Sequence, residues 1–161
     1  MKPIDALDRK ILALLQQDAA IALADLSRAV GLSSTPCWKR VQKLEKAGVI
    51  TGRVALLDPR KVGLALTVFV SIETDDHSQP WLAKFAAAVS AMPEVMDVYR
   101  MAGDVDYLLR VVAPDTAAYD AFYQRLIAAV PLKKVTSRFA MERIKATTVY
   151  PLPAPETADP A

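Results

Sequence analysis

Residues 31–53 read GLSSTPCWKRVQKLEKAGVITGR, and this stretch decides how the N-terminal part of the chain folds. Gly31 permits a sharp turn, and Ser33 is a suitable N-cap for a helix that follows it. Pro36 falls in the first helical turn, where the missing N–H leaves no helical hydrogen bond unmade. Gly48 then ends the helix. The stretch predicts a turn and a helix of about four turns.

The predicted helix has one apolar face and one polar, cationic face. At helical spacing Cys37, Val41 and Leu44 share the apolar side. The opposite side carries two hydroxyls at its N-terminal tip, then an aromatic ring, an amide and three lysines: Ser34, Thr35, Trp38, Lys39, Gln42, Lys43 and Lys46. A helix that enters the major groove of DNA needs this order, because short donors read base edges and cations contact phosphates. The alternative is an ordinary amphipathic helix with a solvated basic face.

A second helical pattern before the turn favours DNA binding over that alternative. Residues 21–30 place Leu26, Ala29 and Val30 on an inward face, and a short turn at Gly31 joins them to the next helix. This is the helix-turn-helix arrangement. An earlier amphipathic helix over residues 5–17 is expected to close a three-helix core.

Composition limits the classes of protein that this chain can represent. It has 161 residues, of which 53% are hydrophobic and 24% charged, which predicts one or two small folded domains. The longest uncharged apolar run, residues 62–72, is too short to cross a bilayer as a helix. The N-terminus has no signal-peptide pattern, so we expect a cytoplasmic protein. One cysteine and one histidine exclude an internal disulfide framework and a histidine-rich metal site, and we expect no cofactor.

Charge is distributed unevenly along the chain. Residues 1–62 hold 11 Lys and Arg against 6 Asp and Glu, whereas residues 63–161 hold 9 against 12. The first part is therefore basic and the second acidic. This asymmetry favours a nucleic-acid-facing N-terminal domain and a C-terminal domain with another task.

Beyond residues 58–60 the pattern changes from helical to βαββαβ. We expect strands over residues 64–73, 95–101, 105–113 and 136–145, and helices over residues 80–92 and from Pro114 to Pro131. Two βαβ-like halves give a ferredoxin-like fold with both helices on one face of the sheet. Residues 49–56 look like a short wing or exit strand. The expected division is a helix-turn-helix domain over 1–52, a linker or wing strand over 53–62, a ferredoxin-like domain over 63–146 and a Pro-rich, disordered tail over 147–161.

The strands predict self-association. Residues 64–73 and 105–113 are apolar on both faces at several positions, yet the helices cover only one face. The other face is expected to pack against the same sheet of a second subunit. A dimer also places two recognition helices on symmetric half-sites of a pseudo-palindromic DNA operator.

With both domains placed, the chain resembles the Lrp/AsnC (feast/famine) family of bacterial and archaeal transcription regulators. The matching segments are LDRKIL at 7–12, LSRAVGLS at 26–33, TPC at 35–37 with Arg40 and Leu44-Glu45, GVI at 48–50, LLDP at 56–59, GDVDYLL at 103–109 and Met141-Glu142. The resemblance implies an α+β protein, in which a winged-type helix-turn-helix is joined to a ferredoxin-like ligand-binding (RAM) domain. It also implies dimers formed through the sheets, further assembly into octamers, and small amino-acid effectors bound between ligand domains.

The resemblance implies roles for individual residues in DNA binding. Ser34, Thr35, Trp38 and Lys39 match positions that face bases, with Gln42 beside them. Lys43 and Arg53 are the expected phosphate partners, with a merely solvated arginine as the alternative for Arg53. Arg40 is also a candidate for contact with DNA, with a structural ion pair as the alternative.

For the effector, residues 101–107 match the family's ligand loop. Asp104 and Asp106 are candidates to bind an ammonium group, and backbone N–H groups near Gly103 to bind a carboxylate; turn capping is the alternative for both aspartates. Ser137 matches a family threonine near the pocket, while Val135 stands where another polar residue is common. The predicted effector set is Met101, Ala102, Gly103, Asp104, Asp106, Tyr107 and Ser137.

One segment narrows the resemblance within the family. TPCWKR at 35–40, with Trp81, Phe85 and RMAG at 100–103, is similar to regulators that switch on cysteine degradation in response to L-cysteine. Cys37 itself lies on the inward face, so we expect it to pack rather than to act as a thiol sensor.

We therefore expect a sequence-specific regulator of amino-acid metabolism that is not an enzyme. One rival is a small ferredoxin-like hydrolase of the acylphosphatase type, but the chain contains no asparagine and its single histidine, His77, forms no evident nucleophile–base pair. The second rival is an architectural DNA-coating protein without an effector.

Overall fold

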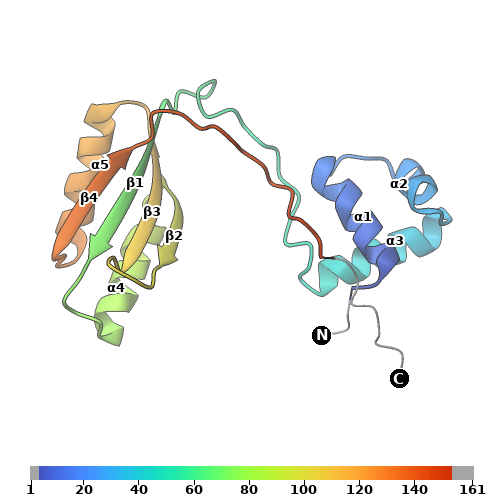
Figure 1. Ribbon diagram of the computed structural model, residues 1–161, viewed down its shortest axis with the longest axis horizontal. Helices are drawn as coiled ribbons and strands as arrows, with labels where there is room; N and C mark the ends of the chain where they lie inside the picture. Colours follow the sequence, from blue (N-terminus) through green and yellow to red (C-terminus); the bar gives the residue numbers. More distant parts are fainter. Residues whose placement is uncertain (1–3, 154–161) are drawn as a thin grey trace. The chain divides into compact units, whose positions relative to one another are not determined.

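The structure, a computed structural model, describes residues 4–153, and the chain divides into two compact units (Figure 1). Among the described residues, the first unit contains residues 4–55 and 145–153, and the second contains Leu56–Ile144. Three helices form the first unit, and a four-stranded sheet with two helices forms the second. No helix among residues 4–153 is long and apolar enough to span a membrane.

The three helices of the first unit are α1 (Ala6–Gln17), α2 (Leu23–Val30) and α3 (Ser34–Lys46). They enclose a core of seven buried residues: Ile11, Leu12, Leu26, Val30, Cys37, Val41 and Leu44. The predicted helix-turn-helix is therefore confirmed. The inward position of Ala29 was predicted wrongly, because Ala29 is exposed and Ser27 is buried in its place, with its hydroxyl donating to the Ala24 carbonyl at 3.0 Å.

The turn between α2 and α3 depends on glycine. Gly31 has a φ of 76°, in the left-handed region that favours glycine, and the N–H of Leu32 reaches back to the Ser27 carbonyl at 2.9 Å. Ser33 occupies the N-cap position of α3 with extended backbone, but its hydroxyl makes no capping bond, so only its predicted position is confirmed. Gly48, with a φ of 70°, follows the last turn of α3.

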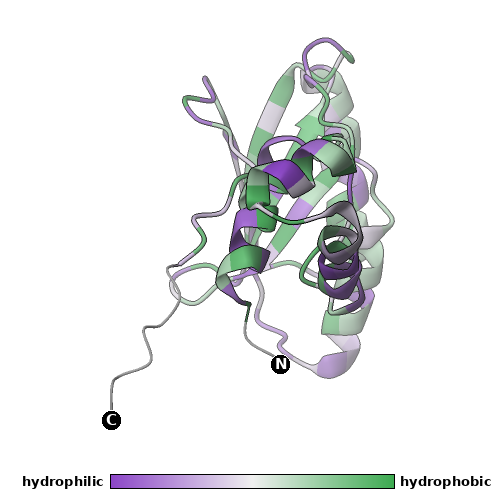
Figure 2. Cartoon of the chain, turned by 90° about the vertical axis from the view of Figure 1, so that its right-hand side faces the viewer, coloured by the Kyte–Doolittle hydropathy of each residue, from purple (hydrophilic) through white to green (hydrophobic). Residues whose placement is uncertain are grey.

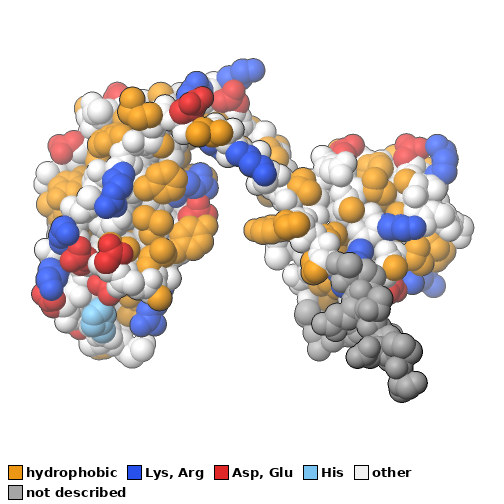
Figure 3. Space-filling view, in the orientation of Figure 1, with side chains coloured by type: hydrophobic (Ala, Val, Ile, Leu, Met, Phe, Trp, Pro, Cys, Tyr) orange, Lys and Arg blue, Asp and Glu red, His pale blue; other side chains and the backbone are white. Residues whose placement is uncertain are grey.

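The predicted wing or exit strand over residues 49–56 is wrong, because no strand lies between α3 and the first strand of the sheet. A strand needs a neighbouring strand to receive its backbone hydrogen bonds. Here Val54, Leu56 and Leu57 are 70–78% exposed. Figure 3 shows hydrophobic side chains standing out along the segments that connect the two units.

The second unit is an antiparallel sheet in the order β2-β3-β1-β4. Its elements are β1 (Leu66–Glu73), α4 (Gln79–Ser90), β2 (Val95–Arg100), β3 (Tyr107–Ala113), α5 (Thr116–Ala129) and β4 (Lys134–Phe139). In the register, Val70 of β1 lies opposite Leu109 on one side and Ser137 on the other. The predicted βαββαβ ferredoxin-like fold is confirmed.

The bounds of all four strands differ from the prediction. β1 and β3 each start two residues later than expected, β2 ends one residue earlier, and β4 covers residues 134–139 instead of 136–145. β4 ends early because it pairs only with β1. The last pairs of that ladder join Phe139 to Val68 and the Ala140 N–H to the Thr67 carbonyl. β1 itself begins at Leu66, so in this register it has no residue to pair with the predicted strand positions 142–145.

Both helices cover one face of the sheet, and their apolar residues form the larger core (Figure 1). The strands carry mostly hydrophobic residues in Figure 2. The Trp81 and Phe85 rings of α4 stack with centroids 5.1 Å apart, and the Trp81 indole donates to the Pro131 carbonyl at 2.9 Å. Ile127 of α5 is 40% exposed.

The region predicted as a disordered tail is described only in part. Residues 147–153 form neither helix nor strand, and residues 154–161 lie outside the described range. The described part is bonded to α1 through the Gln16 side chain and the backbone of Tyr150.

Candidate functional site

The exposed face of α3 is the first candidate site. Ser34, Thr35, Lys39 and Lys46 are exposed at the surface. A shallow depression of about 420 Å³ is lined by Lys39, Gln42, Lys43, Lys46 and Ala47. Lysines with short donors at the helix N-terminus suit a surface that meets phosphates and base edges.

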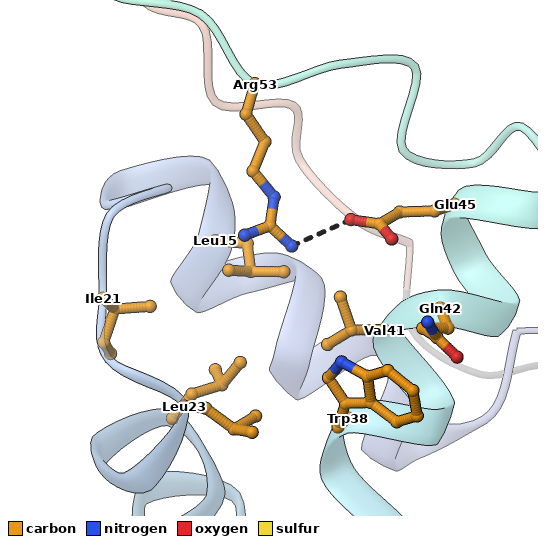
Figure 4. Close-up of a pocket in the computed structure, with 9 residues that line it drawn as sticks. Leu15, Ile21, Leu23, Trp38, Val41, Gln42, Glu45 and Arg53 are labelled. Carbon is orange, nitrogen blue, oxygen red and sulfur yellow. Dashed lines mark hydrogen bonds and ion pairs between the residues drawn. The ribbon is translucent and has the colours of Figure 1, made fainter.

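Trp38 lies at the flank of this face and is 47% exposed. Its ring lines a neighbouring hollow of about 450 Å³ together with apolar side chains of the other helices and of the segment before α2 (Figure 4). The lining residues are Leu15, Ile21, Leu23, Leu26, Trp38, Val41, Gln42, Glu45 and Arg53. The indole therefore rests partly on apolar side chains, which restrict its position beside the lysines.

Arg53 is paired with Glu45 above the same hollow, with its Nη2 atom 2.9 Å from Oε1 (Figure 4). Both side chains are 43% exposed. An ion pair this exposed contributes little to stability, so Arg53 can exchange Glu45 for a phosphate at small cost. Arg53 is thus ion-paired rather than merely solvated, and its contact with phosphate stays a prediction.

Arg40 is turned toward α1. Its Nη1 atom lies 2.5 Å from Asp5 Oδ2 and 2.7 Å from Asp8 Oδ1, and Asp8 is only 1% exposed. The hydrogen bonds that Arg40 donates to Asp5 and then to Asp8 raise the pKa of Arg40 above its usual value. The N–H of Asp8 and then Arg40 lower the pKa of Asp5. This is the structural ion pair that the sequence analysis gave as the alternative for Arg40, and it holds the guanidinium against α1.

Sequence reasoning missed Asp5 and Asp8 as members of this site. The N–H of Asp8 donates to Asp5 at 2.8 Å, and the N–H of Asp5 donates to Asp8 at 3.4 Å, which forms a capping box. Two acidic residues three apart at a helix start are the signal that could have found it. Asp8 also lies 3.7 Å from the Lys43 ammonium, so it connects the start of α1 to two cations of α3.

The predicted effector loop forms the turn between β2 and β3. Residues 101–104 are exposed, and Gly103 has a φ of 135°. Asp106 accepts from the Thr74 N–H at 2.8 Å, and its backbone carbonyl accepts from the Met101 N–H at 2.8 Å. The Asp106 side chain is therefore bonded to the turn that follows β1, whereas Asp104 stands exposed at the surface, and the effector contacts of both aspartates stay a prediction.

Tyr107 and Ser137 lie apart from that exposed loop, on the helix-covered face. Tyr107 is buried, with its ring centroid 4.7 Å from that of Phe85. The Ser137 hydroxyl is hydrogen-bonded to that of Tyr119, whose pKa is raised by burial. A single chain therefore brings residues 101–106 together, but it packs Tyr107 in its core and hydrogen-bonds the half-buried Ser137 to Tyr119.

The second face of the sheet is left uncovered by α4 and α5. Phe69 is 38% exposed there, beside Arg110 in the β1–β3 register. Arg110 in turn donates to Asp97 at 2.5 Å. Figure 3 shows hydrophobic side chains interspersed with charged ones on the visible face of this unit.

A helix-turn-helix with a cationic recognition helix, followed by a ferredoxin-like unit, defines a class of two-domain DNA-binding proteins. Comparison with known proteins identifies the family within this class. Residues 4–51 match the family described as winged helix-turn-helix DNA-binding, and residues 67–150 match the Lrp/AsnC ligand binding domain. The chain belongs to the Lrp/AsnC family of DNA-binding transcriptional regulators.

Individual relatives agree with this assignment over nearly the whole chain. The DNA-binding transcriptional activator DecR of Escherichia coli K12 is 54% identical over 150 residues, covering 92% of this chain and 99% of DecR. This relative supports the predicted similarity to the DecR-like branch. A crystal structure of an AsnC family transcriptional regulator from Agrobacterium tumefaciens is 62% identical, with a TM-score of 0.88 over 91% of this chain and 96% of that one. A regulator from Neisseria meningitidis in complex with L-Met is 33% identical, with a TM-score of 0.87 over 92% and 97% of the two chains.

Proposed function

We propose that this regulator binds a pseudo-palindromic operator as a homodimer, which assembles further into an octamer, and that an amino acid controls this binding. A protein that acts on the chromosome of a bacterium works in the cytoplasm. We propose no catalytic role, because its relatives are named as transcriptional regulators.

The exposed cationic face of α3 carries the DNA-binding part of the proposal. Residues 34 and 35 present hydroxyls at its N-terminal end, and the lysines follow along the same side. The proposed base-reading residues are Ser34, Thr35, Trp38, Lys39 and Gln42, and the proposed phosphate partners are Lys43 and Arg53. Arg40 is left in the internal ion pair with Asp5 and Asp8.

The uncovered sheet face supports the proposed dimer. Phe69 and Tyr99 remain 38% and 54% exposed, on a unit whose other face already has two covering helices. Burying such apolar surface against a second copy stabilises a dimer. Two copies then present two α3 helices to two half-sites of one operator.

We propose L-cysteine as the effector and residues 101–104 as its first contact. The similarity to DecR supports the proposed place of this chain in the cysteine-responsive branch of the family. The L-Met complex of the Neisseria regulator supports an amino acid as the class of ligand. Asp104 is exposed and offers a carboxylate to an ammonium group. Because Tyr107 is buried and the half-buried Ser137 is hydrogen-bonded to Tyr119, we propose that these two residues support the loop rather than contact the effector.

The decisive experiment sequences the genomic DNA fragments that the purified protein retains, with and without L-cysteine. A recurrent palindromic sequence whose recovery changes with L-cysteine is the expected result. Isothermal titration with a panel of amino acids distinguishes this function from the rival one, an architectural DNA-coating protein without an effector. If no amino acid releases heat, the protein is an architectural DNA-binding protein; heat with L-methionine but not L-cysteine would retain the regulator and reject the proposed ligand.

A further inference from the structure

The segment at residues 145–153 has no role in the function described so far. It follows β4, the last strand of the second unit, yet it groups with the three helices of the first unit. Its contacts are made with α1. The Gln16 side chain donates to the Tyr150 carbonyl at 3.3 Å and accepts from the Tyr150 N–H at 2.7 Å. Arg9 donates to the Pro153 carbonyl, and Leu152 packs against the three-helix core.

These contacts resemble those of a bound extended peptide. One side-chain amide satisfies both backbone groups of Tyr150, as a neighbouring strand would. Pro151 and Pro153 restrict the backbone on either side of Leu152, so this segment loses less conformational freedom on docking than a flexible one. Leu152, half-buried between them, supplies the apolar contact.

We propose that the surface of α1 around Arg9 and Gln16 is a docking site for residues 150–153 of the same chain, and that this segment is a strap across the DNA-binding unit. The Arg40 ion pairs join α1 to α3, the recognition helix. A strap that restrains α1 therefore also restrains α3. Residues 145–153 thus connect the second unit to the first, in addition to the linker that follows α3. Between β4 and residue 150 the chain has neither helix nor strand, so β4, which carries Ser137, leads directly into the strap.

Hydrogen exchange measured residue by residue tests the docking in the full chain. The Tyr150 amide is expected to be protected in the wild type, because it donates to Gln16. Gln16→Ala and Leu152→Asp should each accelerate its exchange by roughly tenfold or more, since both remove a docking contact. Gln16→Ala keeps α1 intact because alanine favours helix. Ile144→Asp is the control, because Ile144 directly precedes the segment and is 92% exposed.

Two results of this experiment would overturn the proposal. One is a wild-type Tyr150 amide that exchanges as fast as an amide in an unstructured peptide. The other is an Ile144→Asp variant that accelerates exchange as much as Leu152→Asp does, which would show that the Leu152 contact has no specific effect.

Cross-linking decides whose segment occupies the site. Cysteines introduced by Ala13→Cys, which lies between Arg9 and Gln16 on the same face of α1, and by Tyr150→Cys keep the Gln16 contact and are treated with a short bismaleimide. The buried Cys37 stays out of reach, as the unmodified chain will verify. An internal link within one chain supports the strap. A covalent dimer would show that the segment comes from a second copy, and no link at all would show an empty site; either result overturns the proposal.

DNA binding provides the functional readout. Leu152→Asp is expected to raise the Kd for DNA a few-fold and to leave the salt dependence unchanged, because no phosphate contact is lost. Ile144→Asp should bind as the wild type does. An unchanged Kd in Leu152→Asp would show that the segment docks without restraining the DNA-binding helices, and so would reject the strap. None of these measurements depends on the identity of the effector.

Discussion

Arg40 illustrates how burial at a single residue decides between two roles for the same side chain. On sequence grounds it stood among the cations of a DNA-facing helix, but its guanidinium is bonded to Asp5 and to the buried Asp8. A buried carboxylate needs a cation or several donors, and α3 supplies that cation. Lys43, 49% exposed and 3.7 Å from Asp8, keeps its ammonium near the surface, where it can reach a phosphate.

Substitution of Arg40 by methionine tests this division of roles. Arg40→Met should lower the free energy of unfolding by roughly 3 kcal/mol, because Asp8 is left buried without its nearest cation. The salt dependence of DNA binding should stay as in the wild type. Urea unfolding and binding titrations at several salt concentrations measure the two effects. A salt slope lower by about one unit would place Arg40 on a phosphate instead.

Lys43→Ala should have the opposite effects, changing the salt dependence of DNA binding but not the stability. Affinity for all DNA sequences is expected to fall, and the slope of log K against log salt should decrease by about one unit, since one phosphate contact is lost. Stability should change little, because the ammonium is half-exposed. Lys84→Ala, an exposed lysine on α4, is the control and should leave the slope unchanged. If both variants give the wild-type slope, Lys43 is not a phosphate partner.

At the level of elements, helices could be predicted from the sequence more completely than strands. Helix faces follow from spacing within one segment, so Cys37, Val41 and Leu44 were placed correctly. A strand exists only where a partner strand continues beside it, and local pattern does not contain that information. This is why residues 49–56 form no strand and why β4 ends at Phe139.

The candidate site shows the same division between local and long-range information. The polar face of α3 is a local pattern and was predictable. The bond between Asp106 and the Thr74 N–H joins residues from two different turns, as the pairing of Arg40 with α1 joins two helices. Tyr107 matched a ligand loop by sequence position, yet the alternation of side chains in β3 directs it into the core.

The capping box of α1 predicts how the stability of the protein depends on pH. The pKa of Asp5 is lower in the folded chain than its usual value. The ionised side chain therefore contributes its full stabilisation at any pH above the usual pKa of an aspartate. This contribution is lost as the pH falls through the lowered pKa of the folded state. Asp5→Asn should therefore destabilise the protein at about pH 7 and have little effect at about pH 2, compared by urea unfolding. An equal loss at both pH values would assign the effect to packing rather than to charge.

At the scale of the whole molecule, the uncovered sheet face should determine the oligomeric state. The two faces of the sheet are unequal, because α4 and α5 bury one of them while Phe69 on the other stays 38% exposed. A glutamate at position 69 would bring a charge into any sheet-to-sheet interface, and burying an unpaired charge is strongly unfavourable. Phe69→Glu is therefore expected to be monomeric in sedimentation equilibrium, with unchanged circular dichroism.

A matched variant makes this test specific. Ile127 on α5 is exposed to a similar degree, 40%, but belongs to the helix-covered side. Ile127→Glu should remain a dimer or larger if the uncovered face is the interface. The monomeric Phe69→Glu protein should also bind a single half-site as the wild type does and lose its preference for two half-sites, because each chain keeps its own α3. Should Phe69→Glu remain associated while Ile127→Glu dissociates, the interface lies on the helices, and the paired recognition helices must be arranged around α5 instead.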